Sequence, residues 1–346
     1  MTMEGLDIRS MTISELENMV VSYGENRYRG AQLFSWFHEK KVQNYDQMTN
    51  ISKAFREKLK SDRSLMPLEI EKVLKSELDG TRKYLFRLCD NNIIESVLMR
   101  YKHGNSVCIS SQVGCRMGCR FCASTIDGLE RNLNPSEMLS QVYNIEKDIG
   151  ERVSNIVVMG SGEPLDNYDN LIRFIELVSN DKGINISQRN ITVSTCGIVP
   201  KIYELADLSL QITLAISLHA PNQEKRKEIM PVANKYDLND LLPACSYYFE
   251  KTGRRLTFEY SLIKGVNDSD EDADSLCRLL KGLNAHINLI PVNPIEERQY
   301  RQTEKEAVIS FKNKLEKHGR NVTIRREMGR DINGACGQLR RTYKKE

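Results

Sequence analysis

The chain has 346 residues, of which 40% are hydrophobic and 28% are charged. This composition is typical of a water-soluble globular protein. No apolar run approaches the roughly 18 residues that a membrane-spanning helix needs, which excludes an integral membrane protein of the helical kind. The net charge of +3 is too small to identify a nucleic-acid-binding protein by itself.

Cysteine is the informative residue type, with nine copies in the chain. The number is odd, and the N-terminus shows no charged start followed by an apolar stretch, so a secretory signal is not indicated. Both observations argue against a framework of disulfides and for a reducing compartment. We therefore expect a cytoplasmic protein.

Residues 1–67 have the pattern of a small helical domain. Thr12 and Glu15 match a capping box, and Ile51, Phe55 and Leu59 form one stripe of a later helix. Many basic residues decorate this segment, which fits either a solvated face or contact with RNA. We assign it as an N-terminal accessory, RNA-binding domain.

Residues 68–100 change to a β-rich pattern. Three runs favour strands, and Asp-Gly and Asp-Asn-Asn turns separate them. The runs are Ile70–Leu74, Lys83–Cys89 and Ile93–Arg100. We expect a meander that links the helical domain to the main body.

Residues 101–346 alternate short apolar strands with helices. Asn134, Pro135 and Glu137 mark one helix start, and Thr303 with Glu306 marks another as a capping box. The predicted strands are Val107–Ser110, Ile156–Gly160, Ile191–Thr195, Ile212–Leu218, Leu256–Ile263 and Ile287–Val292. Six β/α units predict an α/β fold with a parallel sheet that curves into a partial (β/α)6 barrel. In such sheets ligand sites gather at the carboxyl ends of the strands.

The sharpest chemical signal is the C-x3-C-x2-C segment formed by Cys115, Cys119 and Cys122, in a loop after the first strand of this body. Cysteine thiolates hold iron–sulfur clusters, usually four to a cubane. Three ligands would leave one iron open for a reagent. A mononuclear zinc site is the competing interpretation, but it needs four ligands.

This spacing at the start of a six-unit β/α body resembles the radical S-adenosylmethionine superfamily. The resemblance implies a [4Fe-4S] cluster on the three cysteines, with the fourth iron free for S-adenosylmethionine. Met159-Gly160-Ser161-Gly162-Glu163-Pro164 is similar to the glycine-acid motif that holds the amino group of this cofactor. By itself the motif also fits a turn at a strand end.

A narrower resemblance, to the RlmN/Cfr family of RNA methyltransferases, covers almost the whole chain. It rests on segments around residues 107–115, 217–220, 288–294 and 325–339. Val113 and the Arg116–Gly118 and Ala123–Thr125 stretches resemble the C2-methylating RlmN branch. That branch implies methylation of C2 of adenosine 2503 in 23S rRNA and of adenosine 37 in tRNAs. The Cfr-type branch, which methylates C8 of the same rRNA adenosine, is the alternative.

The resemblance also implies three catalytic residues. Cys336 would accept a methyl group from one S-adenosylmethionine, and a second would supply the radical that activates it. The RNA would then be tethered to Cys336 until Cys108 captures this residue in a disulfide, with Glu95 as the proton acceptor. Judged alone, each cysteine is more simply a buried small residue, and Glu95 is a solvated strand residue.

The positions that match the family's cofactor contacts lie at or near the carboxyl ends of predicted strands. They are Gly162, Glu163, Ser194, Ser217, Leu218, His219 and Asn293. Their placement follows from the strand pattern independently of the resemblance. His219 alone would more often be a structural histidine than a ligand.

The expected partners are 23S rRNA, tRNA and an external one-electron donor such as flavodoxin, with no membrane and a monomeric chain. From Lys312 to the end, eleven Lys or Arg residues stand against four Asp or Glu residues, a balance that suits a phosphate backbone. A hypothesis of another class is a non-catalytic RNA-binding protein with a structural metal centre.

Overall fold

The computed structural model describes residues 7–63, 65, 68–334 and 338. Cys336 therefore lies outside the described residues. None of the helices in the described part combines the length and the apolar character that crossing a bilayer requires.

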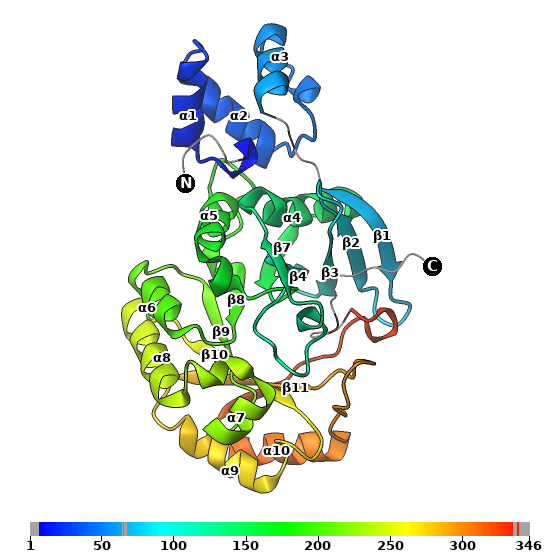
Figure 1. Ribbon diagram of the computed structural model, residues 1–346, viewed down its shortest axis with the longest axis vertical. Helices are drawn as coiled ribbons and strands as arrows, with labels where there is room; N and C mark the ends of the chain where they lie inside the picture. Colours follow the sequence, from blue (N-terminus) through cyan, green and yellow to red (C-terminus); the bar gives the residue numbers. More distant parts are fainter. Residues whose placement is uncertain (1–6, 64, 66–67, 335–337, 339–346) are drawn as a thin grey trace.

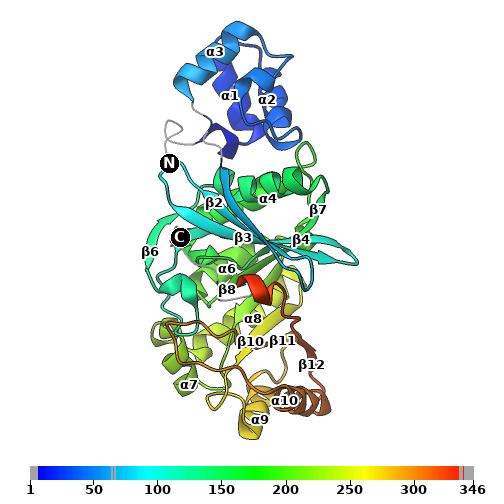
Figure 2. The same ribbon diagram turned by 90° about the vertical axis from the view of Figure 1, so that its right-hand side faces the viewer.

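Three helices at the N-terminal end form a module at one extremity of the molecule (Figures 1 and 2). They are α1 (Ile13–Ser22), α2 (Arg29–His38) and α3 (Lys53–Asp62). The predicted capping box is confirmed, because the Thr12 side chain accepts from the Glu15 N–H and the Glu15 carboxylate accepts from the Thr12 N–H. Such caps satisfy N–H groups that a helix start leaves without partners.

This module is joined to the main body by buried and partly buried polar contacts. Arg173 holds the Glu15 carboxylate with two hydrogen bonds of 2.8 and 2.9 Å. His38 Nδ1 lies 2.9 Å from the Tyr143 hydroxyl. Bidentate arginine–carboxylate pairs fix orientation as well as distance, so the module is docked in a defined pose.

Ten strands of the described chain form one sheet, in the order β1-β2-β3-β4-β7-β8-β9-β10-β11-β12. Their bounds are β1 (Glu69–Lys75), β2 (Arg82–Arg87), β3 (Ile93–Tyr101), β4 (Gly104–Ile109), β7 (Val153–Val158), β8 (Ile191–Thr195), β9 (Thr213–Ser217), β10 (Leu256–Leu262), β11 (Ala285–Pro291) and β12 (Asn321–Ile324). The predicted meander is the antiparallel part, β1 to β3, and it continues the same sheet because β3 pairs with β4 (Figure 2). The proposed domain bounds at 67/68 and 100/101 stay predictions.

From β4 onward neighbouring strands are parallel. Helices connect them on the outside of the curved sheet (Figure 1). These helices are α4 (Pro135–Ile149), α5 (Tyr168–Ser179), α6 (Val199–Asp207), α8 (Leu238–Thr252), α9 (Asp270–Leu279) and α10 (Lys305–Lys317). The short helix α7 (Gln223–Ile229) lies instead beside the loop of the three cysteines, because the N–H of Arg120 donates to Ile229 O. The partial (β/α)6 barrel is therefore confirmed. The residues of β4 and of β7 to β11 are all buried or half-buried, as expected for parallel strands that are covered on both faces.

Three local features differ from the sequence expectations. The helix α10 leads into an additional parallel strand, β12. A short hairpin, β5 (Gln112–Gly114) with β6 (Leu129–Asn132), closes the base of the loop that carries Cys115, Cys119 and Cys122, here called the cysteine loop. Thr303 does not cap α10: its hydroxyl donates to Asp268 Oδ2 at 2.8 Å, and the helix begins after Glu304.

Candidate active site at the strand ends

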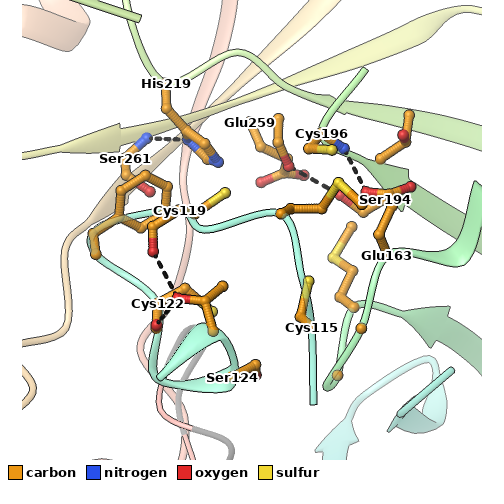
Figure 3. Close-up of a pocket in the computed structure, with 18 of the residues that line it drawn as sticks. Cys115, Cys119, Cys122, Ser124, Glu163, Ser194, Cys196, His219, Glu259 and Ser261 are labelled. Carbon is orange, nitrogen blue, oxygen red and sulfur yellow. Dashed lines mark hydrogen bonds between the residues drawn. The ribbon is translucent and has the colours of Figure 1, made fainter. Parts of the chain in front are cut away.

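One cavity lies at the carboxyl ends of β7 to β11 and gathers most of the predicted site residues (Figure 3). Those that line it are Cys115, Cys119, Cys122, Gly162, Glu163, Ser194, Ser217, His219 and Asn293. These residues come from positions far apart in the sequence, and the parallel sheet brings them to one edge.

The cysteine loop has a fixed shape set by its own hydrogen bonds. The N–H of Cys115 donates to Gly128 O at 3.0 Å, across the base of the loop. At its tip the Thr125 hydroxyl lies 3.1 Å from Cys119 O and 2.9 Å from Cys122 O. From the sequence Thr125 had no role of its own beyond its place in the Ala123–Thr125 stretch, because its role depends on this turn. The loop therefore presents all three cysteines to the cavity (Figure 3).

Two of the three thiols lie where burial disfavours an isolated thiolate. Burial raises the pKa of Cys115 to about 12 and also raises the pKa of Cys119, and neighbouring thiols and Glu163 add to both shifts. A cationic inorganic centre reverses this balance, because coordination deprotonates thiols. In the described chain, no three Cys, His, Asp or Glu side chains converge as ligands of a single ion. The donor set itself, three thiols on one loop that line the cavity, fits a cluster whose fourth iron is open to another ligand.

The two glycines of the glycine-acid motif allow two chain segments to approach closely. A Cβ at Gly160 would lie 2.7 Å from the carbonyl of Ile109, and one at Gly162 would lie 2.6 Å from Gln112 Cβ. Gly162 also has φ +106°, a conformation that favours glycine. These glycines are thus required for packing at the end of β7, in addition to any contact with a ligand.

Glu163 fastens two strand ends to each other. Its carboxylate accepts from the N–H of Leu165 at 3.0 Å and from the N–H of Cys196 at 2.8 Å. Burial raises the pKa of Glu163, and these hydrogen bonds oppose the shift. The carboxylate is therefore held in one orientation at the wall of the cavity.

His219 is fixed as a neutral hydrogen-bond donor toward the cavity. Its Nδ1 accepts from the N–H of Ser261 at 2.9 Å (Figure 3). Burial lowers the pKa of His219 to about 3, with a smaller contribution from the charge of Arg226. A neutral imidazole that accepts at Nδ1 carries its proton on Nε2. The adjacent Leu218 does not line the cavity: its side chain is in the core.

Two charged residues of the cavity wall were given no role from the sequence. Glu259, in the middle of β10, accepts from Asn288 Nδ2 at 3.0 Å and lies 3.8 Å from Arg325 Nη1. Burial raises the pKa of Glu259, and Arg325 opposes this. The available signal was the single charged residue of a mostly buried strand, and a buried charge indicates a partner.

Cys108 lines a second cavity, which shares Met159, Ile290, Asn293 and Arg325 with the first. Across the sheet it pairs with Val97 of β3. Glu95, two residues earlier on β3, is buried and lines neither cavity; its Oε1 lies 3.3 Å from Lys83 Nζ. The geometry thus places Cys108 beside the main site.

Comparison with known proteins identifies the family. A sequence model of the radical SAM superfamily matches residues 109–277, and a model of the ribosomal RNA large subunit methyltransferase N-terminal domain matches residues 6–64. A probable dual-specificity RNA methyltransferase RlmN of Lachnospira eligens is 66% identical over 97% of this chain and 96% of its own. The chain belongs to the RlmN family of radical SAM methyltransferases.

Further relatives agree with this membership. The corresponding RlmN protein of Lachnoclostridium phytofermentans is 59% identical over 98% of this chain and 96% of its own. A crystal structure of a radical SAM methyltransferase from Sphaerobacter thermophilus superimposes with a TM-score of 0.93 at 42% identity, over 96% of this chain and 99% of that one. This member of the RlmN family is therefore an S-adenosylmethionine-dependent methyltransferase, and the hypothesis of a non-catalytic metalloprotein is wrong.

Proposed function

We propose that the enzyme methylates RNA at C2 of adenosine, in 23S rRNA at position 2503 and in tRNAs at position 37. The observation that carries the proposal is the shared wall between the cavity of the three cysteines and the cavity of Cys108. RNA as substrate is supported by the names of the relatives and by the match of residues 6–64 to a ribosomal RNA methyltransferase domain. The RNA would be met in the cytoplasm.

In this proposal Cys115, Cys119 and Cys122 hold a [4Fe-4S] cluster, and the strand-end residues hold S-adenosylmethionine. When bound, this pair supplies a 5′-deoxyadenosyl radical after one electron from an external donor such as flavodoxin. Glu163 offers its fixed carboxylate to the cofactor's amino group, and His219 offers a donor at Nε2. Gly162, Ser194, Ser217, Asn293 and the backbone of Leu218 complete the proposed contacts.

Three side chains carry the methyl group and resolve the product. The Cys336 thiolate takes a methyl group from a first S-adenosylmethionine, which leaves as S-adenosylhomocysteine; a second is consumed in each turnover. After the radical has removed a hydrogen from this methyl group and the carbon has bonded to C2, Glu95 would accept the C2 proton. Cys108 would then bond to the Cys336 sulfur as the bond between that sulfur and the methyl carbon breaks. The released carbon takes up a proton, the one electron supplied at the start is returned, and the disulfide must be reduced before the next turnover.

The decisive experiment is mass spectrometry of nucleosides from RNA treated with anaerobically reconstituted enzyme and isotopically labelled S-adenosylmethionine. We expect labelled 2-methyladenosine in both 23S rRNA and tRNA. A product of 8-methyladenosine would instead assign the enzyme to the Cfr-type branch. Zinc in place of iron and sulfide, after thorough reconstitution, would contradict the cluster.

A substitution of Cys108 tests the resolving step. We expect Cys108→Ala to retain methyl loading on Cys336 but to accumulate a covalent protein–RNA complex, visible as a band of reduced mobility in denaturing gels. Cys336→Ala should give neither methyl loading nor complex. Cys245→Ala, which removes a buried thiol from α8, is the matched control. Free methylated RNA at the normal rate from Cys108→Ala would disprove the role.

A further inference from the structure

A fully buried arginine lies behind the cysteine loop. Arg226 of α7 has a relative exposure of 0%. Its Nη2 donates to Cys196 O at 2.7 Å and its Nη1 donates to Tyr236 O at 3.2 Å. Both acceptors are backbone carbonyls, which satisfy hydrogen bonds but carry no net charge. The guanidinium therefore brings a full positive charge into the interior.

No carboxylate of the described chain lies within ion-pair distance of this charge. Burial lowers the pKa of Arg226, and the groups that oppose the shift are the thiols of Cys196, Cys119 and Cys245. A fully buried arginine is rare unless it is paired, because an isolated charge is costly to remove from water. A neighbouring anionic group would therefore stabilise the charged form of Arg226. Cys119, one of the thiols that oppose the shift, is a proposed ligand of the cluster, so the cluster would be such a group.

The surrounding backbone holds the guanidinium in this place. Gly197 has φ +101°, and a Cβ there would lie 3.3 Å from Arg226 Nη2, so the glycine leaves room for the arginine. The N–H of Arg120 donates to Ile229 O at 2.9 Å, which ties the cysteine loop to the end of α7. Arg226 and the loop thus keep a fixed relation.

We propose that Arg226 is the built-in counter-charge of the iron–sulfur cluster and raises its reduction potential. The inference rests on the proposed function, since it requires the cluster on Cys115, Cys119 and Cys122. Three thiolates make the cluster site anionic, and the electron from the external donor adds one negative charge. A fixed cation in a medium of low dielectric constant favours the more negative, reduced form.

The test is a potentiometric titration of reconstituted full-length enzyme, in which electron paramagnetic resonance measures the reduced cluster. Arg226→Gln removes the charge and keeps hydrogen-bond donors, whereas Arg226→Lys keeps the charge. We expect Arg226→Gln to lower the ratio of reduced to oxidised cluster at least tenfold at a fixed potential, a shift of about 59 mV for one electron. Arg226→Lys should stay within threefold of the wild type.

Arg320 provides the matched control. Its guanidinium also donates to two backbone carbonyls, Cys277 O at 2.7 Å and Leu280 O at 3.1 Å. Neither of these residues lines a cavity of the site, whereas Cys196, which accepts from Arg226, lines the first. We expect Arg320→Gln to leave the potential unchanged. Arg226→Gln with a full cluster and the wild-type potential would overturn the proposal.

The amount of iron and sulfide bound after reconstitution gives a second readout if Arg226→Gln does not bind the cluster. Failure of Arg226→Gln to load, with normal loading of Arg226→Lys, supports the counter-charge. Equal failure, or an equal change of potential, in both variants would show that the hydrogen bonds matter and not the charge, and would overturn the proposal. A wild-type protein that binds no iron and sulfide would overturn the proposed function together with this inference.

Discussion

At the scale of single residues, the side chains of the cavity wall serve the fold as well as any ligand. Glu163 shows this most clearly, because both of its carboxylate oxygens accept backbone N–H groups. A loss of cofactor binding after mutation of such a residue therefore has two sources, lost contact and a displaced strand end. Stability measurements separate them.

We expect Glu163→Gln to destabilise the metal-free protein. An amide presents one oxygen and one NH2 group, so either the Leu165 or the Cys196 N–H would lose its acceptor. An unsatisfied buried donor costs about 1–3 kcal/mol, which urea unfolding would detect. Glu250→Gln, at an exposed position of α8, should change little. Equal stabilities of Glu163→Gln and the wild type would contradict the structural role.

The sequence predicted the residues of the site whose chemistry is concentrated in short motifs. The cysteine triplet and Glu163 belong to this kind. Arg226 could not be found in this way, since it lies in Gln-Glu-Lys-Arg-Lys-Glu-Ile, a run typical of a solvated helix. Only the packing of α7 against the cysteine loop shows that this one charge is buried.

At the scale of elements, apolar periodicity located the strands and helices well, but it did not find contacts made through tertiary structure. β12 has only four residues, too short for a periodic pattern, and its pairing with β11 defines it. Thr303 satisfied the local rule for a helix cap, yet Asp268 from another part of the chain is its partner. A hydrogen bond to a residue distant in the sequence thus replaced the local helix cap that the sequence pattern predicted.

At Gly30, helix propensity and the packing of α1 against α2 predict opposite effects of an alanine on the free energy of unfolding. Alanine in place of glycine inside a helix usually stabilises by about 1 kcal/mol. At Gly30 of α2, however, a Cβ would lie 2.4 Å from Glu17 N of α1. Because the obstacle is backbone, the helices must move apart, and overpacking typically costs about 1–3 kcal/mol. We expect Gly30→Ala to lower the unfolding free energy.

Thermal or urea unfolding of the whole chain measures this effect. Lys58→Ala, at an exposed position of α3, is the control for adding alanine to the same module and should be close to neutral. A stabilised Gly30→Ala protein would show that α1 and α2 pack less closely than the structure indicates.

At the scale of the whole molecule, two buried histidines link stability to pH from opposite regions. Burial lowers the pKa of His38, between the N-terminal module and α4, and of His219, at the strand ends, each to about 3; Arg9 and Arg226 contribute. In the unfolded chain both regain a pKa near 6.5. Their contribution is present above about pH 6.5 and decreases as the pH falls toward 3, because only the unfolded state binds the protons.

Between pH 7.5 and 5.5 each histidine should therefore reduce the unfolding free energy by about 1.4 kcal/mol. Urea unfolding of the metal-free protein at the two values measures the sum. His38→Phe should reduce the difference by about 1.4 kcal/mol, whatever its effect on absolute stability. A pH dependence identical to that of the wild type would show that His38 is not buried in its neutral form.

The sheet described above ends at β1 and β12 instead of closing on itself. The outer edge of β1 faces no other described strand, and a bare strand edge is a template on which a second copy can assemble. Charged side chains at Glu69, Glu71, Lys72 and Lys75 crowd this edge, and most of the strand is exposed or half-buried. β12 limits the hazard by being short. Because the sheet does not close, the edge of β1 stays exposed. The charged side chains of β1 thus protect the protein against aggregation through this edge.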